Sequence, residues 1–198
     1  TPEFIAGLKE LKHLCPHFHL SLQSGSDTVL KRMNRKYTTE EYEDRVKALR
    51  AEFPDMSLTT DIITGFPEET EEEFTETVEY AKKLKFAKIH VFPYSVREGT
   101  RAADMPQIDM SIRKARAKRL IEVSSVLEAE FAKSMIGKKA EILIEKIGEK
   151  DGKTIAEGYT ANYIRTYGEL KTPDITKGSI VKGVITGSEN ENCFIEFD

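Results

Sequence analysis

Residues 57–73 have the sequence SLTTDIITGFPEETEEE, and this stretch indicates one strand, one loop and the start of one helix. The first seven residues are rich in β-branched side chains, which favour a buried strand. Gly65 and Pro67 end the strand, because proline lacks a backbone N–H and fits poorly inside a strand or a helix. Thr70 lies three residues before Glu73, which is the spacing of a capping box at a helix N-terminus. The stretch therefore predicts a strand–loop–helix unit.

The same pattern occurs on both sides of this stretch. Alternating residues at 17–23 predict a short strand, and a capping box at Thr38 and Glu41 opens a helix that runs to about residue 52. A third strand is predicted at 87–92. Strands that alternate with helices predict a parallel sheet, and right-handed crossovers place the carboxyl ends of its strands on one face, where α/β proteins bind ligands. The segments expected to converge there are 23–25, 65–67 and 93–95.

The C-terminal part of the chain has a different pattern of apolar residues. Asp109 precedes a long helical pattern at 110–134, and short alternating runs separated by turn residues follow Gly137. Five such runs predict a small antiparallel β-barrel. The runs are 140–147, 155–159, 163–167, 179–185 and 193–197. We therefore expect two domains, residues 1–136 and residues 137–198.

Composition narrows the classes of function. The 198 residues carry 30 Lys+Arg and 34 Asp+Glu, a net charge of −4, which argues against a surface that is basic throughout. No apolar run reaches the roughly 20 residues that span a bilayer, so we expect no membrane segment. Cys15 and Cys193 are the only cysteines, which predicts a reducing compartment and a cytoplasmic protein. Because Thr1 stands where a Met is usual, we expect a piece of a longer chain.

Three sequence blocks resemble the radical S-adenosylmethionine (SAM) methylthiotransferases. The first is HLSLQSGSD at 19–27, followed by LKRMNRKYT at 30–38. The second, TDIITGFPEET at 60–70, is similar to the family motif TDIIxGFPGET but has Glu68 where glycine is usual. The third is HVFPYS at 90–95, followed by REGT. The alternating runs after Gly137 resemble the TRAM domain, an RNA-binding module at the end of these enzymes.

The resemblance implies an α/β part followed by an all-β part. The first would be the second half of a partial (β/α) radical-SAM barrel, and the second a TRAM, OB-like barrel. The implied activity is methylthiolation of C2 of a modified adenosine next to the tRNA anticodon. EGYTANYI at 157–164 and HVFPYS at 90–95 resemble most the branch acting on N6-threonylcarbamoyladenosine. Alternatives are a branch specific for isopentenyladenosine, a branch specific for a ribosomal-protein aspartate, and a non-catalytic RNA-binding module.

The resemblance also implies cofactors, namely SAM and two [4Fe–4S] clusters in the whole protein. A cluster needs at least three neighbouring thiolates, which Cys15 and Cys193 cannot supply. Three strands also cannot close a barrel. We therefore expect a C-terminal fragment that is inactive alone, and we assign no catalytic or metal-ligating residue. An interrupted barrel leaves an open edge near residues 17–22, which we expect to be hidden by self-association or by the N-terminal segment.

Side chains near the strand ends are candidates for binding SAM. The Gln23 amide and Ser24 hydroxyl can bond the ribose or methionine group, and Arg35 can pair with a carboxylate. For these residues the alternatives are a strand-end turn and a surface ion pair. A structural role is the alternative for Asp61, and a core role for Phe92. The candidate set is Gln23, Ser24, Arg35, Asp61, Gly65, Phe66, Phe92 and Tyr94.

A basic run and a tyrosine-rich region are candidates for binding tRNA. Basic runs on helices usually form a solvated face, but this one leads into the TRAM-like region, which favours phosphate contact. Tyrosine rings can stack on unpaired bases, with the barrel core as the alternative. The set is Arg113, Lys114, Arg116, Lys118, Arg119, Tyr159, Tyr163 and Arg165. Residues 137–198 hold 9 positive and 11 negative side chains, so any RNA contact should be local.

Overall fold

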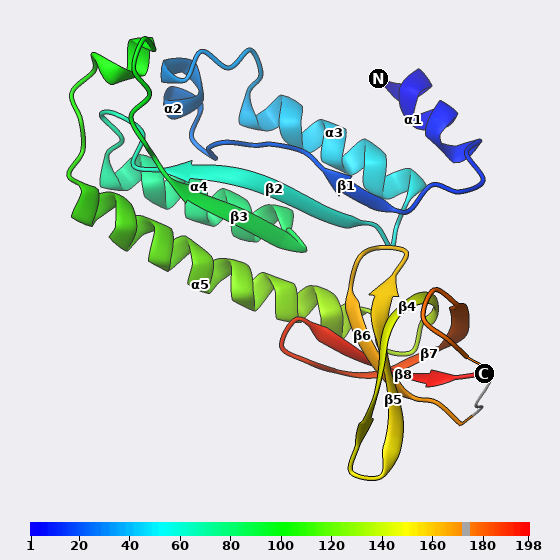
Figure 1. Cartoon of the computed structure of the whole chain (residues 1–198). Coiled ribbons are helices and arrows are strands. Elements are labelled where there is room, and N and C mark those ends of the chain that lie inside the picture. Colours follow the sequence, from blue (N-terminus) through cyan, green and yellow to red (C-terminus); the bar gives the residue numbers. More distant parts are fainter. Residues whose placement is uncertain (172–174) are drawn as a thin grey trace. The chain divides into compact units, whose positions relative to one another are not determined.

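The computed structural model describes residues 1–171 and 175–198, which form two compact units. The first unit consists of residues 1–14, 18–54 and 58–127, and the second of residues 15–17, 55–57 and 128–198. Figure 1 labels their helices and strands. Within the described ranges, no helix is both long and apolar enough to cross a membrane.

A three-stranded sheet forms the centre of the first unit. Its strands are β1 (His17–His19), β2 (Ser57–Thr64) and β3 (Lys88–Pro93), in the order β1-β2-β3. β2 and β3 are parallel, and Gln23 makes a further parallel bridge to Ile62. The predicted parallel sheet is thus confirmed.

β1 is shorter than expected because a side chain interrupts its ladder. The Leu22 N–H donates to the hydroxyl of Thr60 (2.8 Å) rather than to a backbone carbonyl. Backbone bonding to β2 resumes at Gln23, whose N–H donates to the carbonyl of Asp61 (2.8 Å). The chain therefore follows β2 up to Gln23 without forming a continuous strand.

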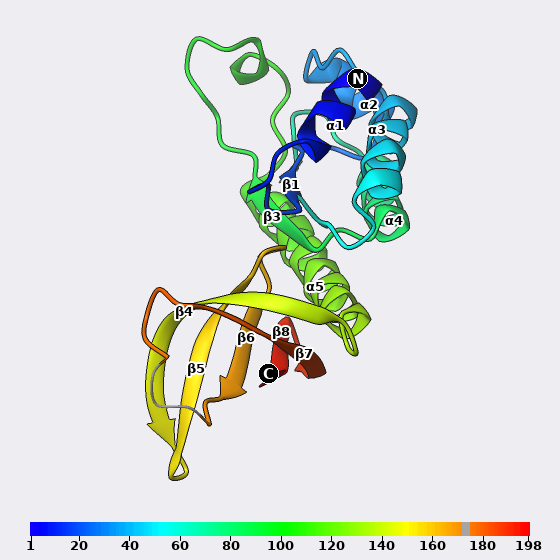
Figure 2. The same cartoon turned by 90° about the vertical axis from the view of Figure 1, so that its right-hand side faces the viewer.

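Helices cover one face of the sheet. The side chains of Leu58 and Ile62 are buried on that face, and Figure 2 shows α3 and α4 lying along it. Tyr42 of α3 donates its hydroxyl to the carbonyl of Leu20 (2.6 Å), and Phe74 of α4 is fully buried. The opposite face carries polar side chains. The helices are α1 (Pro2–Lys9), which had no sequence prediction, α2 (Asp27–Arg32), α3 (Thr39–Glu52), α4 (Glu71–Leu84), the 3₁₀ turn η1 (Arg101–Ala103) and α5 (Met110–Ser134).

Both predicted capping boxes are confirmed. In α4 the Glu73 N–H donates to the Thr70 hydroxyl (3.2 Å), and the Thr70 N–H donates to the Glu73 carboxylate (2.9 Å). The same carboxylate accepts hydrogen bonds from the Thr28 hydroxyl (2.6 Å) and the Arg32 guanidinium (2.9 Å). Glu73 therefore both caps α4 and ties α2 to it.

The second unit holds a closed five-stranded barrel. Its strands are β4 (Lys139–Lys150), β5 (Lys153–Thr160), β6 (Arg165–Glu169), β7 (Ile180–Glu189) and β8 (Asn192–Phe197), in the order β4-β5-β6-β8-β7. The predicted small barrel is confirmed, and four of its neighbouring strand pairs are antiparallel as expected, whereas β6 and β8 are parallel. The reason is parity, since strand directions cannot alternate around a closed ring with an odd number of members.

The last turn of α5 and the residue that follows it pack against the barrel core. Ala132 and Met135 are buried in the same cluster as Ile142, Ile144 and Ile185. The compact unit accordingly starts at residue 128. The domain division at 136/137 stays a prediction.

Acid should test the role of Glu73. Burial alone would raise its pKa, but bonds from Arg32, Thr28 and the Thr70 N–H lower it from 4.5 to about 2. A carboxylate whose pKa is lower in the folded state stabilises the fold above its unfolded-state pKa, so this stabilisation should fade between pH 4.5 and 2. We expect Glu73→Gln to lower the melting temperature at neutral pH and to flatten its fall over that range. Glu72→Gln, an exposed neighbour, should keep the wild-type profile; identical profiles for all three proteins would contradict this role.

Glu68 is exposed and has a left-handed backbone with φ of 63°, at the position where the family motif has glycine. This conformation costs a residue with a Cβ atom roughly 1 kcal/mol. We expect Glu68→Gly to raise the free energy of unfolding by up to about 1 kcal/mol. Glu72→Gly, the same exchange inside α4, should lower it by about 1 kcal/mol. Urea unfolding measures both, and equal losses would show that the backbone at Glu68 is unstrained.

Candidate functional site

The loop after β1 places Gln23 at the carboxyl edge of the sheet. Gln23 has φ of 70°, and its side-chain amide makes no hydrogen bond within the described part of the chain. The Ser24 hydroxyl, in contrast, lies 3.2 Å from that of Thr77 and accepts the N–H of Ser26 (3.2 Å). Gln23 is 8% exposed with its amide unpaired in the described residues, so a role in SAM binding stays a prediction, while the Ser24 hydroxyl supports the loop.

Asp61 belongs to a polar network on the face of the sheet opposite α3 and α4. Its carboxylate lies 3.2 Å from Nε2 of His19 and accepts the Ser21 hydroxyl (3.2 Å). Nδ1 of His19 lies 3.0 Å from the Thr59 hydroxyl, and the His90 ring lies 5.8 Å from that of His19. The sequence prediction of the site missed His19, Ser21 and His90, although their alternation along the strands indicated a shared face.

Phe92 follows His90 on the same face and is 50% exposed. The ring is therefore not part of the core, and it can lie against a planar ligand. Arg35 is also exposed, and its side chain forms no salt bridge in the described residues. Both side chains are free to contact a ligand.

The loop after β2 is closed by a buried carboxylate. Oε1 of Glu69 accepts the N–H of Gly65 (2.9 Å) and Nη1 of Arg116 (2.8 Å), and the same Nη1 donates to the Glu69 carbonyl (2.9 Å). Burial raises the pKa of Glu69, against the opposing pull of the Gly65 N–H and Arg116. The sequence prediction named only Thr70 and Glu73 as the capping residues of this acidic stretch and so missed Glu69. Because the Glu69 carboxylate bonds both the Gly65 N–H and Arg116, it holds the loop after β2 against α5.

Gly65 itself makes room for α5. Its φ is 68°, and a Cβ there would lie 2.5 Å from Cγ of Arg113. The space that glycine provides is therefore filled by Arg113. That Gly65 contributes to SAM binding stays a prediction.

Arg113 also fixes the loop after β3. It donates to the carbonyls of Tyr94 and Ile108 (both 2.8 Å) and to the Gln107 amide oxygen (3.0 Å). The Tyr94 ring packs edge-on against Phe66 at 5.3 Å, and both belong to a small buried cluster. Phe66 and Tyr94 are thus core residues beneath the strand ends.

The five positive charges at 113–119 do not form one surface. Arg113 and Arg116 are only 4% and 6% exposed, and their guanidinium groups bond inside the protein. Arg119 pairs with Glu71 and lies over the ring of Phe74. The burial of Arg113 and Arg116 does not favour RNA contact, which for these two arginines stays an untested prediction. Lys114 and Lys118, which are exposed and four residues apart on α5, remain available.

The tyrosines of the barrel form an exposed stack. The rings of Tyr159 and Tyr163 are 4.8 Å apart and nearly parallel, and Tyr163 is 65% exposed. Arg165 pairs with Glu157 and lies 5.3 Å from the centre of the Tyr167 ring. The Tyr163 ring also packs edge-on with that of His17 (5.2 Å), so it is exposed but has aromatic neighbours.

The described residues do not fit an iron–sulfur cluster. Cys15 is exposed, whereas Cys193 is buried, donates to the carbonyl of Ala132 (3.5 Å), and has its pKa raised to about 11 by burial. The part of the chain that the structure describes also holds no group of three His, Cys, Asp or Glu residues suited to a metal. The iron ligands of such a cluster would have to come from elsewhere.

Removing Arg116 should be far more costly than removing Arg119. Arg116→Ala leaves the Glu69 carboxylate buried without its partner, which typically costs about 3 kcal/mol or more. Arg119→Ala removes an exposed pair and should cost about 1 kcal/mol or less. Urea unfolding followed by helical circular dichroism measures both. The double variant Arg116→Met/Glu69→Leu buries no charge and should recover much of the loss; similar losses for Arg116→Ala and Arg119→Ala would refute the role of the pair.

Comparisons with known proteins find relatives that match the sequence of this chain. Residues 1–81 match the model of the radical SAM superfamily. The chain is 42% identical over 184 residues to the threonylcarbamoyladenosine tRNA methylthiotransferase MtaB of Bacillus subtilis, covering 92% of this chain and 40% of that protein. It is 40% identical over 165 residues to the tRNA-2-methylthio-N(6)-dimethylallyladenosine synthase of Thermoanaerobacter sp. (strain X514), covering 83% and 35%.

A third relative is the synthase of the same name from Desulfitobacterium hafniense, 47% identical over 134 residues, which are 67% of this chain and 30% of that protein. The chain thus spans about 30–40% of the length of these relatives. The two kinds of relative match similarly well and do not separate the two substrates. With the strand ends, the three sequence blocks and these matches in agreement, the chain belongs to the radical SAM tRNA methylthiotransferase family.

Proposed function

We propose that this chain is part of a cytoplasmic enzyme that methylthiolates C2 of N6-threonylcarbamoyladenosine in tRNA. Two observations support the proposal together. The three-stranded sheet has a polar face around Asp61 and His19, and the relatives of the chain are named for tRNA methylthiolation. The match extending over 92% of the chain is to the threonylcarbamoyladenosine enzyme, which supports this branch. The second candidate is the dimethylallyladenosine branch, which relatives of similar identity favour.

The chain would supply part of the SAM site. SAM, bound at a [4Fe–4S] cluster whose ligands lie outside these residues, provides the radical chemistry of such enzymes. Here the Gln23 amide is free to bond its polar groups, Arg35 its carboxylate, and Phe92 can lie against its adenine. Asp61, which is held by His19 and Ser21, has a fixed orientation toward the same face.

The open edge of the sheet supports a proposal about association. In the described residues β1 pairs only with β2, and a three-stranded sheet has two edges. We expect the isolated chain to associate through the β1 edge unless its N-terminal segment covers it. Light scattering measures this, and a strict monomer in which β1 is uncovered would count against the idea.

Nucleoside analysis tests the function and the branch together. In a strain that lacks the gene, we expect tRNA to lose 2-methylthio-N6-threonylcarbamoyladenosine and to keep 2-methylthio-N6-dimethylallyladenosine. The full-length protein should restore the lost nucleoside. The opposite pattern would assign the other branch, and unchanged amounts of both nucleosides would refute the function. The 198-residue chain alone, reconstituted with iron and sulfide, should not cleave SAM.

The role of α5 in tRNA binding can be tested with exposed lysines. We expect Lys114→Glu/Lys118→Glu to weaken tRNA binding and to reduce the slope of log affinity against log salt by about 1 for each phosphate that is no longer neutralised. The matched control is Lys12→Glu/Lys31→Glu, which changes the net charge equally at exposed lysines elsewhere in the first unit. Filter binding at several salt concentrations measures this. Equal effects of the two double variants would show a non-specific charge effect.

A further inference from the structure

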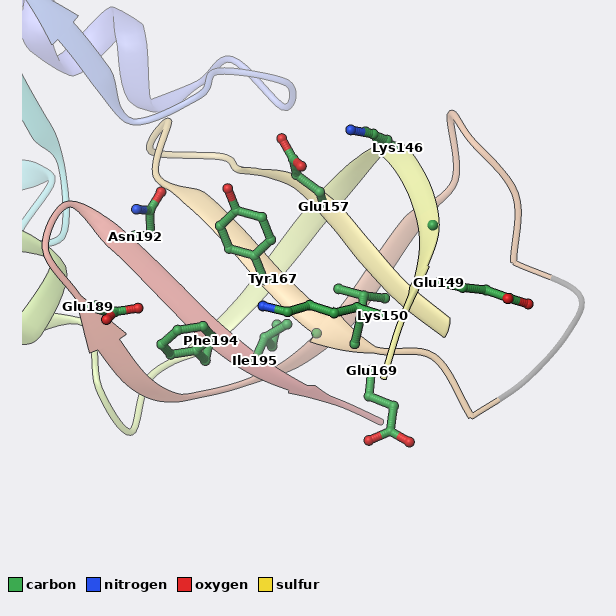
Figure 3. A pocket seen from close by; sticks show the side chains of 13 residues that line it. Lys146, Glu149, Lys150, Glu157, Tyr167, Glu169, Glu189, Asn192, Phe194 and Ile195 are labelled. Carbon is green, nitrogen blue, oxygen red and sulfur yellow. The ribbon is translucent and has the colours of Figure 1, made fainter. Parts of the chain in front are cut away.

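The barrel carries a groove that neither the SAM site nor the basic helix uses. Its volume is about 660 Å³, and its walls come from β4, β5, β6, β8 and the end of β7 (Figure 3). This size lies within the range of pockets that hold small organic ligands. Its lining includes Lys146, Gly148, Lys150, Tyr167, Asn192 and Phe194.

Two aromatic residues on neighbouring strands line this groove. Tyr167 of β6 and Phe194 of β8 are partners in register across the parallel pair. Phe194 is 40% exposed, whereas its neighbours Cys193 and Ile195 are buried in the barrel core. Adjacent, partly exposed aromatic rings on a sheet form a platform on which a flat ring can stack.

One position of β4 in the groove carries no side chain. Gly148 alternates with Lys146 and Lys150 along β4, and all three line the groove. A Cβ at Gly148 would meet no atom within 4 Å. The floor of the groove thus keeps space for a ligand that any larger residue would occupy.

A polar atom at the rim lacks a partner. Oδ1 of Asn192 is buried and accepts no hydrogen bond from the residues that the structure describes. Leaving such an acceptor unpaired costs free energy, which a ligand with a donor N–H can recover. Nucleobases carry such N–H donors at the edge of the ring, while the two ring faces remain free to stack.

Charge in the groove is balanced. Glu157 pairs with Arg165 and Glu169 with Lys153, while Lys146 and Lys150 offset Glu149 and Glu189. A balanced groove does not attract phosphate strongly, so recognition there would depend on stacking and hydrogen bonding.

We propose that this groove binds one unstacked nucleobase, with Tyr167 and Phe194 as the platform and Asn192 as hydrogen-bond acceptor. The proposal deepens the RNA-binding part of the proposed function and rests on it for the source of the base. It adds a contact that differs in kind from Lys114 and Lys118, because it depends little on salt.

Fluorescence anisotropy of a labelled hexaadenylate with the full 198-residue chain tests the groove. We expect Phe194→Ala to weaken binding about tenfold, the loss of one stacked base. Gly148→Leu should weaken it similarly by filling the groove, and this variant removes no packed atom. Ile180→Ala, which truncates a side chain that is 67% exposed outside the groove, should bind within about twofold of the wild type. Circular dichroism checks that each variant is folded.

Salt and competition identify the ligand. From about 50 to 200 mM salt, hexaadenylate affinity should fall less than about tenfold, as expected for one or two phosphate contacts. Displacement by AMP would mean that a free nucleotide suffices, and its failure would assign the groove to an RNA strand. Wild-type affinity in Gly148→Leu, or no binding of hexaadenylate at all, would overturn the proposal. Phe194→Ala and Gly148→Leu could leave hexaadenylate affinity unchanged while Lys114→Glu/Lys118→Glu still weakens tRNA binding. That result would refute the groove and leave the proposed function intact.

Discussion

A buried ion pair between Arg116 and Glu69 holds the carboxyl edge of the sheet in shape. Isolated charges are unstable inside a protein, so each group requires the other and further hydrogen bonds besides. Glu69 meets this requirement with the Gly65 N–H, and Arg116 with the Glu69 carbonyl. The constraint thereby fixes the loop after β2 against α5. Arg113, three residues earlier on the same helix, then fixes the loop after β3 through Tyr94.

Local signals in the sequence were enough to predict most of the first unit. Both capping boxes, the three strands and the long helix after Asp109 depend on neighbouring residues, and the structure has all of them. The short β1 could not be foreseen, because it ends where the hydroxyl of Thr60 replaces a carbonyl from another strand. The parallel pair in the barrel, by contrast, follows from five strands and closure alone and could have been derived.

The site was harder to predict than the fold because burial of polar groups depends on distant partners. Arg113, Lys114, Arg116, Lys118 and Arg119 look alike as a run of charges, yet two of them are buried. Only the folded chain shows that Glu69 and Tyr94 lie where these two arginines can reach them. Ser24 and Gly65 illustrate the same limit, since their partners Thr77 and Arg113 are more than 45 residues away along the chain. Exposed residues such as Phe92 and Tyr163 remain available for the roles that their chemistry predicts.

The parallel pair of β6 and β8 has the fewest residue pairs in register of all neighbouring strands in the barrel. β6 and β8 are joined only at Thr166–Cys193 and Tyr167–Phe194, whereas each of the other neighbouring pairs has five or more residue pairs in register. Local opening of a closed sheet begins where the fewest hydrogen bonds must break. Tyr167 and Phe194 belong to this pair of strands. A flat ligand that contacts both would stabilise the pairing of β6 with β8. Amide exchange should then slow in these two strands more than elsewhere in the barrel.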